Sequence, residues 1–171
     1  MNPSIQRFLA FWRERDVSLR RGVETESLAA FEQKYGVVVP EDFREFLLLS
    51  NGTDETLMEY LAFWPVQEMQ RVTEVFSEAG YEILDPQNPA HLPHAASYLV
   101  FADYLIHSFF YAIALDSAAG VGNVVFVDGT NWYRCARSFS DFIDCYLREA
   151  ASLAFGGFLP PLKSSGIEPE N

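Results

Sequence analysis

The 171-residue sequence has few of the features that mark exported, membrane-spanning or nucleic-acid-binding proteins. It contains only two cysteines, and its N-terminal segment has Arg7 inside a short apolar run, which is the wrong order for a secretory signal. No apolar run approaches the roughly 20 residues that a membrane-spanning helix needs. We therefore expect a cytoplasmic protein with reduced thiols and no membrane partner.

Positive charge is also scarce, because 12 Lys and Arg stand against 24 Asp and Glu and give a formal net charge of −12. Nucleic-acid binding depends mainly on basic side chains that neutralise phosphates, so this balance argues against DNA or RNA as a partner. Residues 1–23 carry five Arg against two acids, whereas residues 24–59 carry two basic residues against nine acids. The acidic part fits a basic partner, and the alternative is that the excess acid only maintains solubility.

Motifs for catalysis or cofactor binding are missing as well: there is no nucleophile elbow, Gly-rich phosphate loop or dinucleotide fingerprint. The best metal candidate is the pair His91 and His94. Pro93 opposes the helical turn that would aim both imidazoles at one ion, so we favour a surface-loop pair over a zinc site. We predict no enzyme activity, no cofactor and no metal, with a metal-dependent hydrolase using these two histidines as an alternative.

Two further groups of potentially reactive side chains are better explained by structural roles than by chemistry. Cys135 and Cys145 fall on a predicted strand and a predicted helix without CxxC spacing, which is typical of small buried hydrophobic residues. Asp103, Tyr104 and His107 are close in sequence. Strand alternation puts the first two on opposite sides, with His107 just past the strand end, so we expect a turn-lining role rather than acid–base chemistry.

The sequence is rich in material for a packed core, with 49% hydrophobic and 15% aromatic residues. A chain of this length buries about 70% of its unfolded surface, which suffices for one domain. Helical spacing and capping residues predict five helices. They are residues 3–16, a helix from Thr25 to Gly36, a helix entered at Pro40 and ended by Asn51-Gly52, one opened by Pro65, and one capped by Ser138 and ended by Gly156-Gly157.

Runs of β-branched and aromatic residues predict the strands. They lie at residues 61–66, 98–104, 109–115, 123–129 and 132–136, and the three-proline stretch 81–95 reads as a loop. Several short strands joined by polar or Gly-containing turns indicate neighbouring strands of an antiparallel sheet. The predicted fold class is therefore α+β, with several helices packed on a mainly antiparallel sheet.

An ordered set of residues carries a resemblance to a known family. A helix is followed by Tyr35-Gly36, an apolar run with Pro40, Asp42-Phe43, Phe46-Leu47 and Asn51-Gly52. Later come Phe63-Trp64-Pro65-Val66, the two strands at residues 99–104 and 111–115, and Ser138-Phe139 at the start of a last helix that contains Phe142. This order resembles the SUKH superfamily, the Smi/Knr-like group, over roughly residues 24–149. The resemblance implies a SUKH-like α+β fold. It also implies either a bacterial immunity protein that neutralises a polymorphic toxin or a regulatory scaffold like the fungal relatives, and neither role implies catalysis.

We predict a single SUKH-like domain over residues 1–171. Its core spans about 24–155, the helix at 3–16 lies outside the common core, and a flexible tail covers about 160–171. The leading hypothesis is a non-enzymatic immunity protein that occludes a basic, nuclease-like toxin, and the alternative is a regulatory scaffold without a toxin partner. The partner-binding candidates are three acids, which would meet cations of the toxin, and three aromatics near strand ends, which would serve as anchors. They are Glu45, Asp54, Glu55, Trp64, Tyr104 and Trp132.

Overall fold

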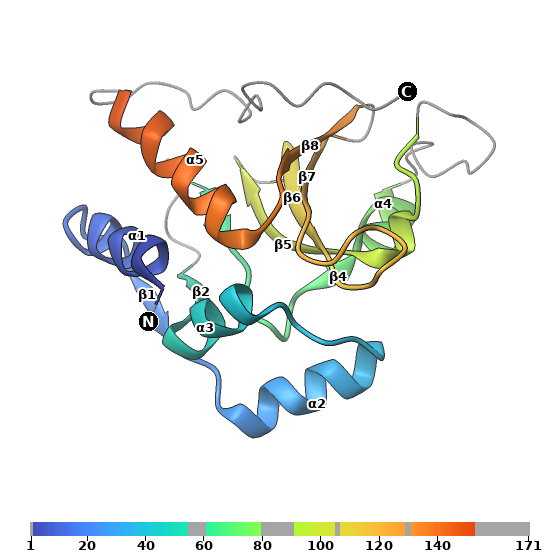
Figure 1. The fold of residues 1–171 in the computed structure, drawn as a ribbon, viewed down its shortest axis with the longest axis horizontal. Coiled ribbons are helices and arrows are strands. Elements are labelled where there is room, and N and C mark those ends of the chain that lie inside the picture. Colours follow the sequence, from blue (N-terminus) through green and yellow to red (C-terminus); the bar gives the residue numbers. More distant parts are fainter. Residues whose placement is uncertain (1, 55–60, 80–90, 105–106, 129–130, 153–171) are drawn as a thin grey trace.

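The computed structural model describes residues 2–54, 61–79, 91–104, 107–128 and 131–152 (Figure 1). Glu55, most of the predicted loop, Gly156-Gly157 and the predicted tail lie outside the described residues. The helices are α1 (Pro3–Arg13), α2 (Thr25–Tyr35), α3 (Glu41–Leu49), α4 (Val72–Ala79), the short 3-10 helix η2 (Ala95–Ser97) and α5 (Phe139–Ser152). The strands are β1 (Leu19–Arg21), β2 (Ser50–Thr53), β3 (Leu61–Phe63), β4 (Gln70–Arg71), β5 (Tyr98–Tyr104), β6 (Phe109–Ala114), β7 (Val124–Val127) and β8 (Trp132–Ala136).

The described residues form a six-stranded antiparallel sheet in the order β3-β5-β6-β7-β8, with β4 also paired to β5. The strands β5 to β8 follow one another in sequence and in space, as hairpin connections allow. A separate two-stranded sheet joins β1 to β2. The predicted α+β class with a mainly antiparallel sheet is confirmed.

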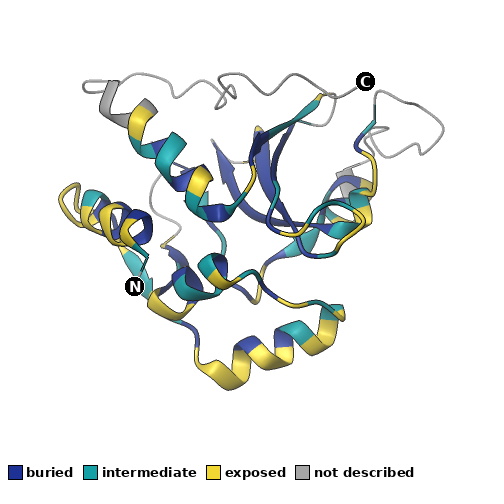
Figure 2. Cartoon of the chain, in the orientation of Figure 1, coloured by how far each residue is buried: buried dark blue, intermediate teal, exposed yellow. Residues whose placement is uncertain are grey.

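Both faces of the central sheet are covered, and every residue of β5, β6 and β7 is buried. Phe101 and Tyr111 point to a core shared with α1, α2, α3 and α5, whereas Val100 and Ala112 point to a second core with α4. Figure 1 shows α5 and α4 on opposite sides of the sheet, and Figure 2 shows the strands between them in the colour of buried residues. Burial on both sides explains why these strands are continuous apolar runs instead of alternating ones.

Helix α1 is part of the main core. Its predicted apolar face is confirmed, because Ile5, Phe8, Leu9 and Trp12 are all buried. The ring of Phe8 lies between helices and sheet, with centroid distances of 4.2 Å to Trp12, 5.3 Å to Phe63 and 5.5 Å to Tyr146. An element that contributes four buried side chains to the shared core is not a detachable lid.

The predicted end of the helix entered at Pro40 is wrong by two residues. Pro40 is the N-cap, α3 ends at Leu49, and Asn51 and Gly52 lie within strand β2. The Asn51 side chain accepts a hydrogen bond from the Val66 backbone N–H at 2.8 Å, so it docks β2 on the chain that follows β3. Gly52 has φ +85° and approaches the Phe63 carbonyl so closely that a Cβ would lie 2.3 Å from its oxygen. The Asn51-Gly52 pair is therefore explained by the close packing of β2 against the β3 segment, and Ser50 is the C-cap of α3.

The helix that we predicted to open at Pro65 begins instead at Val72. The N–H of Met69 reaches the Pro65 carbonyl in a single turn at 3.3 Å, and then Gln70 pairs with Val100 in the sheet. Pairing of β4 with β5 overrides the local helical signal at this point. The C-terminal helix, by contrast, is capped as predicted, because the hydroxyl of Ser138 accepts a hydrogen bond from the Asp141 N–H at 3.0 Å.

Candidate functional site

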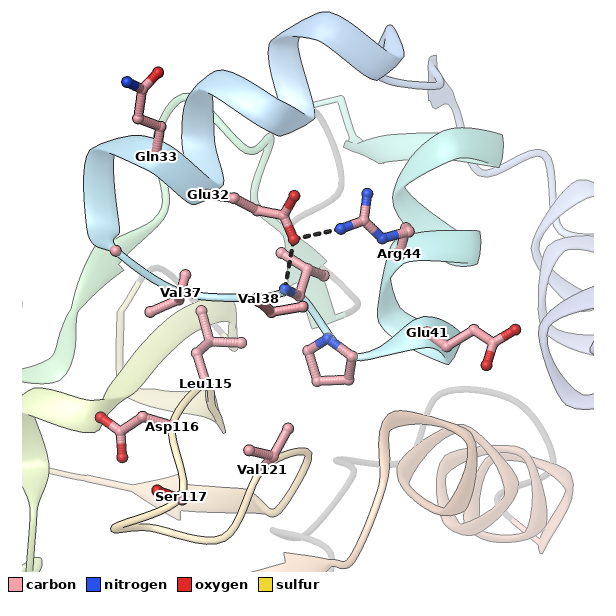
Figure 3. Close-up of a pocket in the computed structure, with 13 residues that line it drawn as sticks. Glu32, Gln33, Val37, Val38, Glu41, Arg44, Leu115, Asp116, Ser117 and Val121 are labelled. Atoms are coloured by element: carbon pink, nitrogen blue, oxygen red, sulfur yellow. Dashed lines mark hydrogen bonds and ion pairs between the residues drawn. The ribbon is translucent and has the colours of Figure 1, made fainter.

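A groove with a volume of about 990 Å³ lies between the link that joins α2 to α3 and the loop that joins β6 to β7 (Figure 3). We call it the link groove. It is open to solvent rather than enclosed, and its size lies at the upper end of the range for ligand sites. Its lining residues are Glu32, Gln33, Gly36, Val37, Val38, Val39, Pro40, Glu41 and Arg44 on one side, and Leu115, Asp116, Ser117 and Val121 on the other.

The first wall is shaped by residues with local conformational preferences. Gly36 ends α2 in the left-handed conformation, with φ +65°, as the sequence predicts. Burial changes along the three valines that follow: Val37 is partly buried, Val38 is exposed and Val39 is buried. Val39 is 2% exposed and enters the main core, whereas Val38 is 73% exposed and stands over the groove. Of these two adjacent valines, one therefore contributes to the core and the other remains on the surface.

An ion pair ties the two helices of this wall together. One carboxylate oxygen of Glu32 accepts hydrogen bonds from the Val39 N–H, at 2.7 Å, and from the guanidinium of Arg44 (Figure 3). Burial by itself raises the pKa of Glu32, but the Arg44 hydrogen bond, the Val39 hydrogen bond and the charge of Arg44 together outweigh it, so the pKa lies below its ordinary value. Glu32 is thus an anion that fixes the link between α2 and α3.

The second wall is the β6–β7 loop. Its Asp116 accepts a hydrogen bond from the Ala118 N–H at 2.9 Å, and the hydrogen bond from the Ser97 side chain is the largest of the effects that lower the pKa of Asp116. Val121 lies between two glycines with positive φ and is 53% exposed. This wall therefore also combines an anion held by hydrogen bonds with an uncovered valine.

The electrostatic balance of the groove is acidic. Three carboxylates, of Glu32, Glu41 and Asp116, face one guanidinium, of Arg44, which is already paired with Glu32. The described residues that line it include neither a His nor a Cys, and its exposed valines and its carboxylates make the surface both apolar and acidic.

The two predicted acidic candidates that the structure describes, Glu45 and Asp54, lie outside this groove. Glu45 accepts a hydrogen bond from the Asn2 backbone N–H at 2.7 Å and so helps to hold the start of α1. Asp54 accepts a hydrogen bond from the Ser18 hydroxyl at 2.9 Å and lies 3.9 Å from Arg20 Nε. Both acids therefore have intramolecular partners, and Glu55 is not among the described residues. Their role in partner binding stays a prediction.

The predicted aromatic candidates are all at least partly covered. Tyr104 is 4% exposed and stacks on Phe109, with ring centroids 4.9 Å apart. Trp64 and Trp132 are partly buried against the core on the α4 side of the sheet. Of the predicted partner-binding residues that the structure describes, none lines the link groove. Sequence reasoning missed both valines of the groove, because Val38 stood only as a member of the apolar run before Pro40 and Val121 was not singled out.

The alternative chemical clusters have structural roles in the described part of the chain. Asp103 accepts hydrogen bonds from the Trp64 indole N–H and from the His107 backbone N–H, the latter at 3.1 Å, so it lines a turn as predicted. Burial raises the pKa of the Cys135 thiol, which suits an inert core residue. Among the described residues, which include His91 and His94, no group of three or more His, Cys, Asp or Glu is placed to hold a metal.

Comparison with known proteins identifies the family. The described segments contain no helix with the length and apolarity that a bilayer crossing demands. A search of curated proteins gives no significant match. The model of the SMI1 / KNR4 family (SUKH-1), however, matches residues 22–145, which is well over half of the chain and includes the α2–α3 link, the central sheet and the start of α5. On this match the chain belongs to the SMI1 / KNR4 (SUKH-1) family.

Proposed function

We propose that this protein is a non-enzymatic immunity protein that binds a basic, nuclease-like protein toxin and covers its active site. The observation that carries the proposal is the family match over residues 22–145, because SUKH proteins are known for toxin-immunity roles and are generally non-catalytic. The net charge of −12 supports a cationic partner, since complementary charge speeds association and raises the local concentration of the partner.

The fold supports inhibition by binding alone. Its central sheet is covered on both faces and its helices are joined by buried aromatic contacts, so the surface is fixed before the partner arrives. A preformed surface loses little conformational entropy on binding, which favours tight association. An inhibitor of this kind acts stoichiometrically: each molecule of immunity protein removes one molecule of toxin, and no substrate is turned over.

The test is co-expression with the toxin encoded beside this protein. We expect growth to be restored, and we expect toxin activity in vitro to fall in proportion to added immunity protein until the two are equimolar. Growth no better than with the toxin alone rejects the proposal. Binding without loss of toxin activity favours the regulatory scaffold instead.

The acidic candidates can be tested in the same complex. Reversal of Asp54 and Glu55 to Lys should slow association with the toxin, and the effect should shrink as salt screens the charges. Glu14→Lys is the control, because Glu14 is an exposed acid at the end of α1, in the basic N-terminal segment. Equal association rates for the double variant and the control would remove Asp54 and Glu55 from the binding surface.

A further inference from the structure

We infer that the link groove docks an extended segment of the toxin in which apolar side chains are flanked by Lys or Arg. The inference rests on the proposed function, because it takes the occupant of the groove from the toxin. It assigns a specific place on the molecule to an interaction that the family match leaves without one.

The distribution of exposed apolar side chains is the first evidence that the groove is a binding site. Among the described residues, the exposed large hydrophobic side chains are Val38, Leu48, Leu49 and Val121. Single exposed hydrophobics are ordinary on protein surfaces. Here two of the four line one groove from opposite walls, Val38 on the α2–α3 link and Val121 on the β6–β7 loop (Figure 3). An apolar side chain inserted between them would remove both from water at once.

The two walls are held in place by interactions that do not involve the valines. The Glu32 carboxylate ties the Val39 backbone to Arg44 on α3, and Asp116 is held by the Ala118 N–H and the Ser97 side chain. Because these bonds exist without a ligand, the groove does not have to form when a partner binds. Pre-organisation of this kind reduces the cost of association.

Charge selects the class of occupant. The groove carries three carboxylates against one guanidinium, a formal balance of −2, and the guanidinium is occupied by Glu32. Glu41 is exposed at the start of α3, where a Lys or Arg of the partner can reach it. A second copy of this chain is a poor occupant, because it brings a further net charge of −12. An anionic ligand is disfavoured for the same reason.

The occupant is a polypeptide segment rather than a small molecule. The groove is open to solvent and offers an exposed valine on each wall, with carboxylates among its other lining residues. This arrangement suits an extended chain that presents apolar and basic side chains in alternation, since neighbouring side chains of an extended segment point in opposite directions. A small ligand would remain largely in contact with water.

The experiment uses the full chain and a phage-displayed library of random linear peptides. We expect selection on the wild-type protein to enrich peptides that combine Lys or Arg with apolar residues. Binding of these peptides to the double variant Val38→Ser, Val121→Ser should be weaker by about 10- to 100-fold, the effect of losing the burial of one or two valine-sized groups without a change of charge. Leu48→Ser is the control, because Leu48 is exposed outside the groove, and it should bind the peptides as the wild type does.

A second pair of variants tests the charge. Glu41 and Glu26 are both exposed acids in the first turn of a helix, but only Glu41 lines the groove. We expect Glu41→Gln to weaken peptide binding several-fold at low salt and Glu26→Gln to leave it unchanged. The thermal transitions of all variants should stay close to that of the wild type, because the substituted side chains are on the surface.

Several outcomes overturn the inference. They are the absence of enriched peptides, enriched peptides without basic residues, or equal binding to the wild type and the Val38, Val121 double variant. If the wild type is dimeric in solution and becomes monomeric when the two valines are substituted, then the groove binds a second copy of this chain and not the toxin. The growth assay separates the two proposals: failure of the wild type rejects the toxin function, whereas full protection by the double variant rejects only the groove.

Discussion

Substitution of Phe8 by Ala tests the conclusion that α1 belongs to the core. Phe8 is fully buried and its ring contacts those of Trp12, Phe63 and Tyr146. Burial of such a side chain contributes about 1.5–3 kcal/mol, and the cavity left by Ala adds a further loss, so Phe→Ala changes in cores cost about 3–5 kcal/mol. Because domains of this kind are stable by about 5–15 kcal/mol, the variant should lose a large fraction of its stability.

The assay is equilibrium unfolding in urea, followed by tryptophan fluorescence. With a slope of about 2 kcal/mol per molar urea, a loss of about 4 kcal/mol moves the unfolding midpoint down by about 2 M. The signal is informative because Trp12 lies on the same helix, 4.2 Å from the Phe8 ring between centroids. Gln6→Ala is the control, since Gln6 is an exposed residue of α1, and its midpoint should stay close to that of the wild type.

A clear result would refute this reasoning. The family match begins at residue 22, so it does not include α1. If the matched region folds as an independent core, Phe8→Ala should lower the free energy of unfolding by less than about 1 kcal/mol, the range of surface substitutions. A loss of that size, or an early partial transition of the fluorescence before the main one, would make α1 a detachable element.

Other predictions concern backbone strain, pH and thiol reactivity. Gly52→Ala should lower the free energy of unfolding by about 2 kcal/mol or more, because its Cβ would collide with backbone, whereas Gly36→Ala should cost only about 1 kcal/mol, since nothing lies within 4 Å. The folded-state pKa of Glu32 is lowered, so its stabilising contribution is present above the unfolded value of 4.5 and is lost as the pH falls through the folded value. In urea titrations, the stability difference between the wild type and Glu32→Gln should be constant near neutral pH and shrink below pH 4.5; a constant difference down to pH 2 would contradict this. An aromatic disulfide reagent should modify Cys145 in the native protein and Cys135 only after unfolding, because Cys135 is buried and its thiol pKa is raised; two fast thiols in the native state would be the contrary result.

Much of the fold could be predicted because its signals are local. The apolar face of α1, the left-handed Gly36, the cap at Ser138 and the apolar strand runs each depend on residues within a few positions of one another. The errors occur where contact with a segment distant in the sequence determines the local structure. Gln70 leaves the helical pattern to pair with β5, and Gly52 is required by the close approach of β3 rather than by the end of a helix. No periodicity within the sequence reports such contacts.

The link groove could not be predicted for the same reason. Val38 and Val121 come from segments far apart in the sequence. Only the packing of α2 and α3 beside the β6–β7 loop places them on the two walls of one groove. The acids that stood out in the sequence are used differently. Glu45 holds the backbone of Asn2, and Asp54 accepts the Ser18 hydroxyl. A residue type suited to partner binding is equally suited to internal hydrogen bonds, and the sequence alone does not separate the two uses.

The architecture itself limits where a partner can bind. Because helices cover both faces of the central sheet, its strands offer little surface, and a partner must contact the helices, the loops or the sheet edge. Loops accept substitutions more readily than the core that supports them. Glu32 ties the link to α3 through Arg44, and the hydrogen bond from the Ser97 side chain ties Asp116 of the β6–β7 loop to η2, so the exposed valines can change without loss of the groove. Under the proposed docking, contact with a partner would fall to the exposed valines and to Glu41, whereas Glu32 and Asp116 keep the shape of the groove through their internal hydrogen bonds.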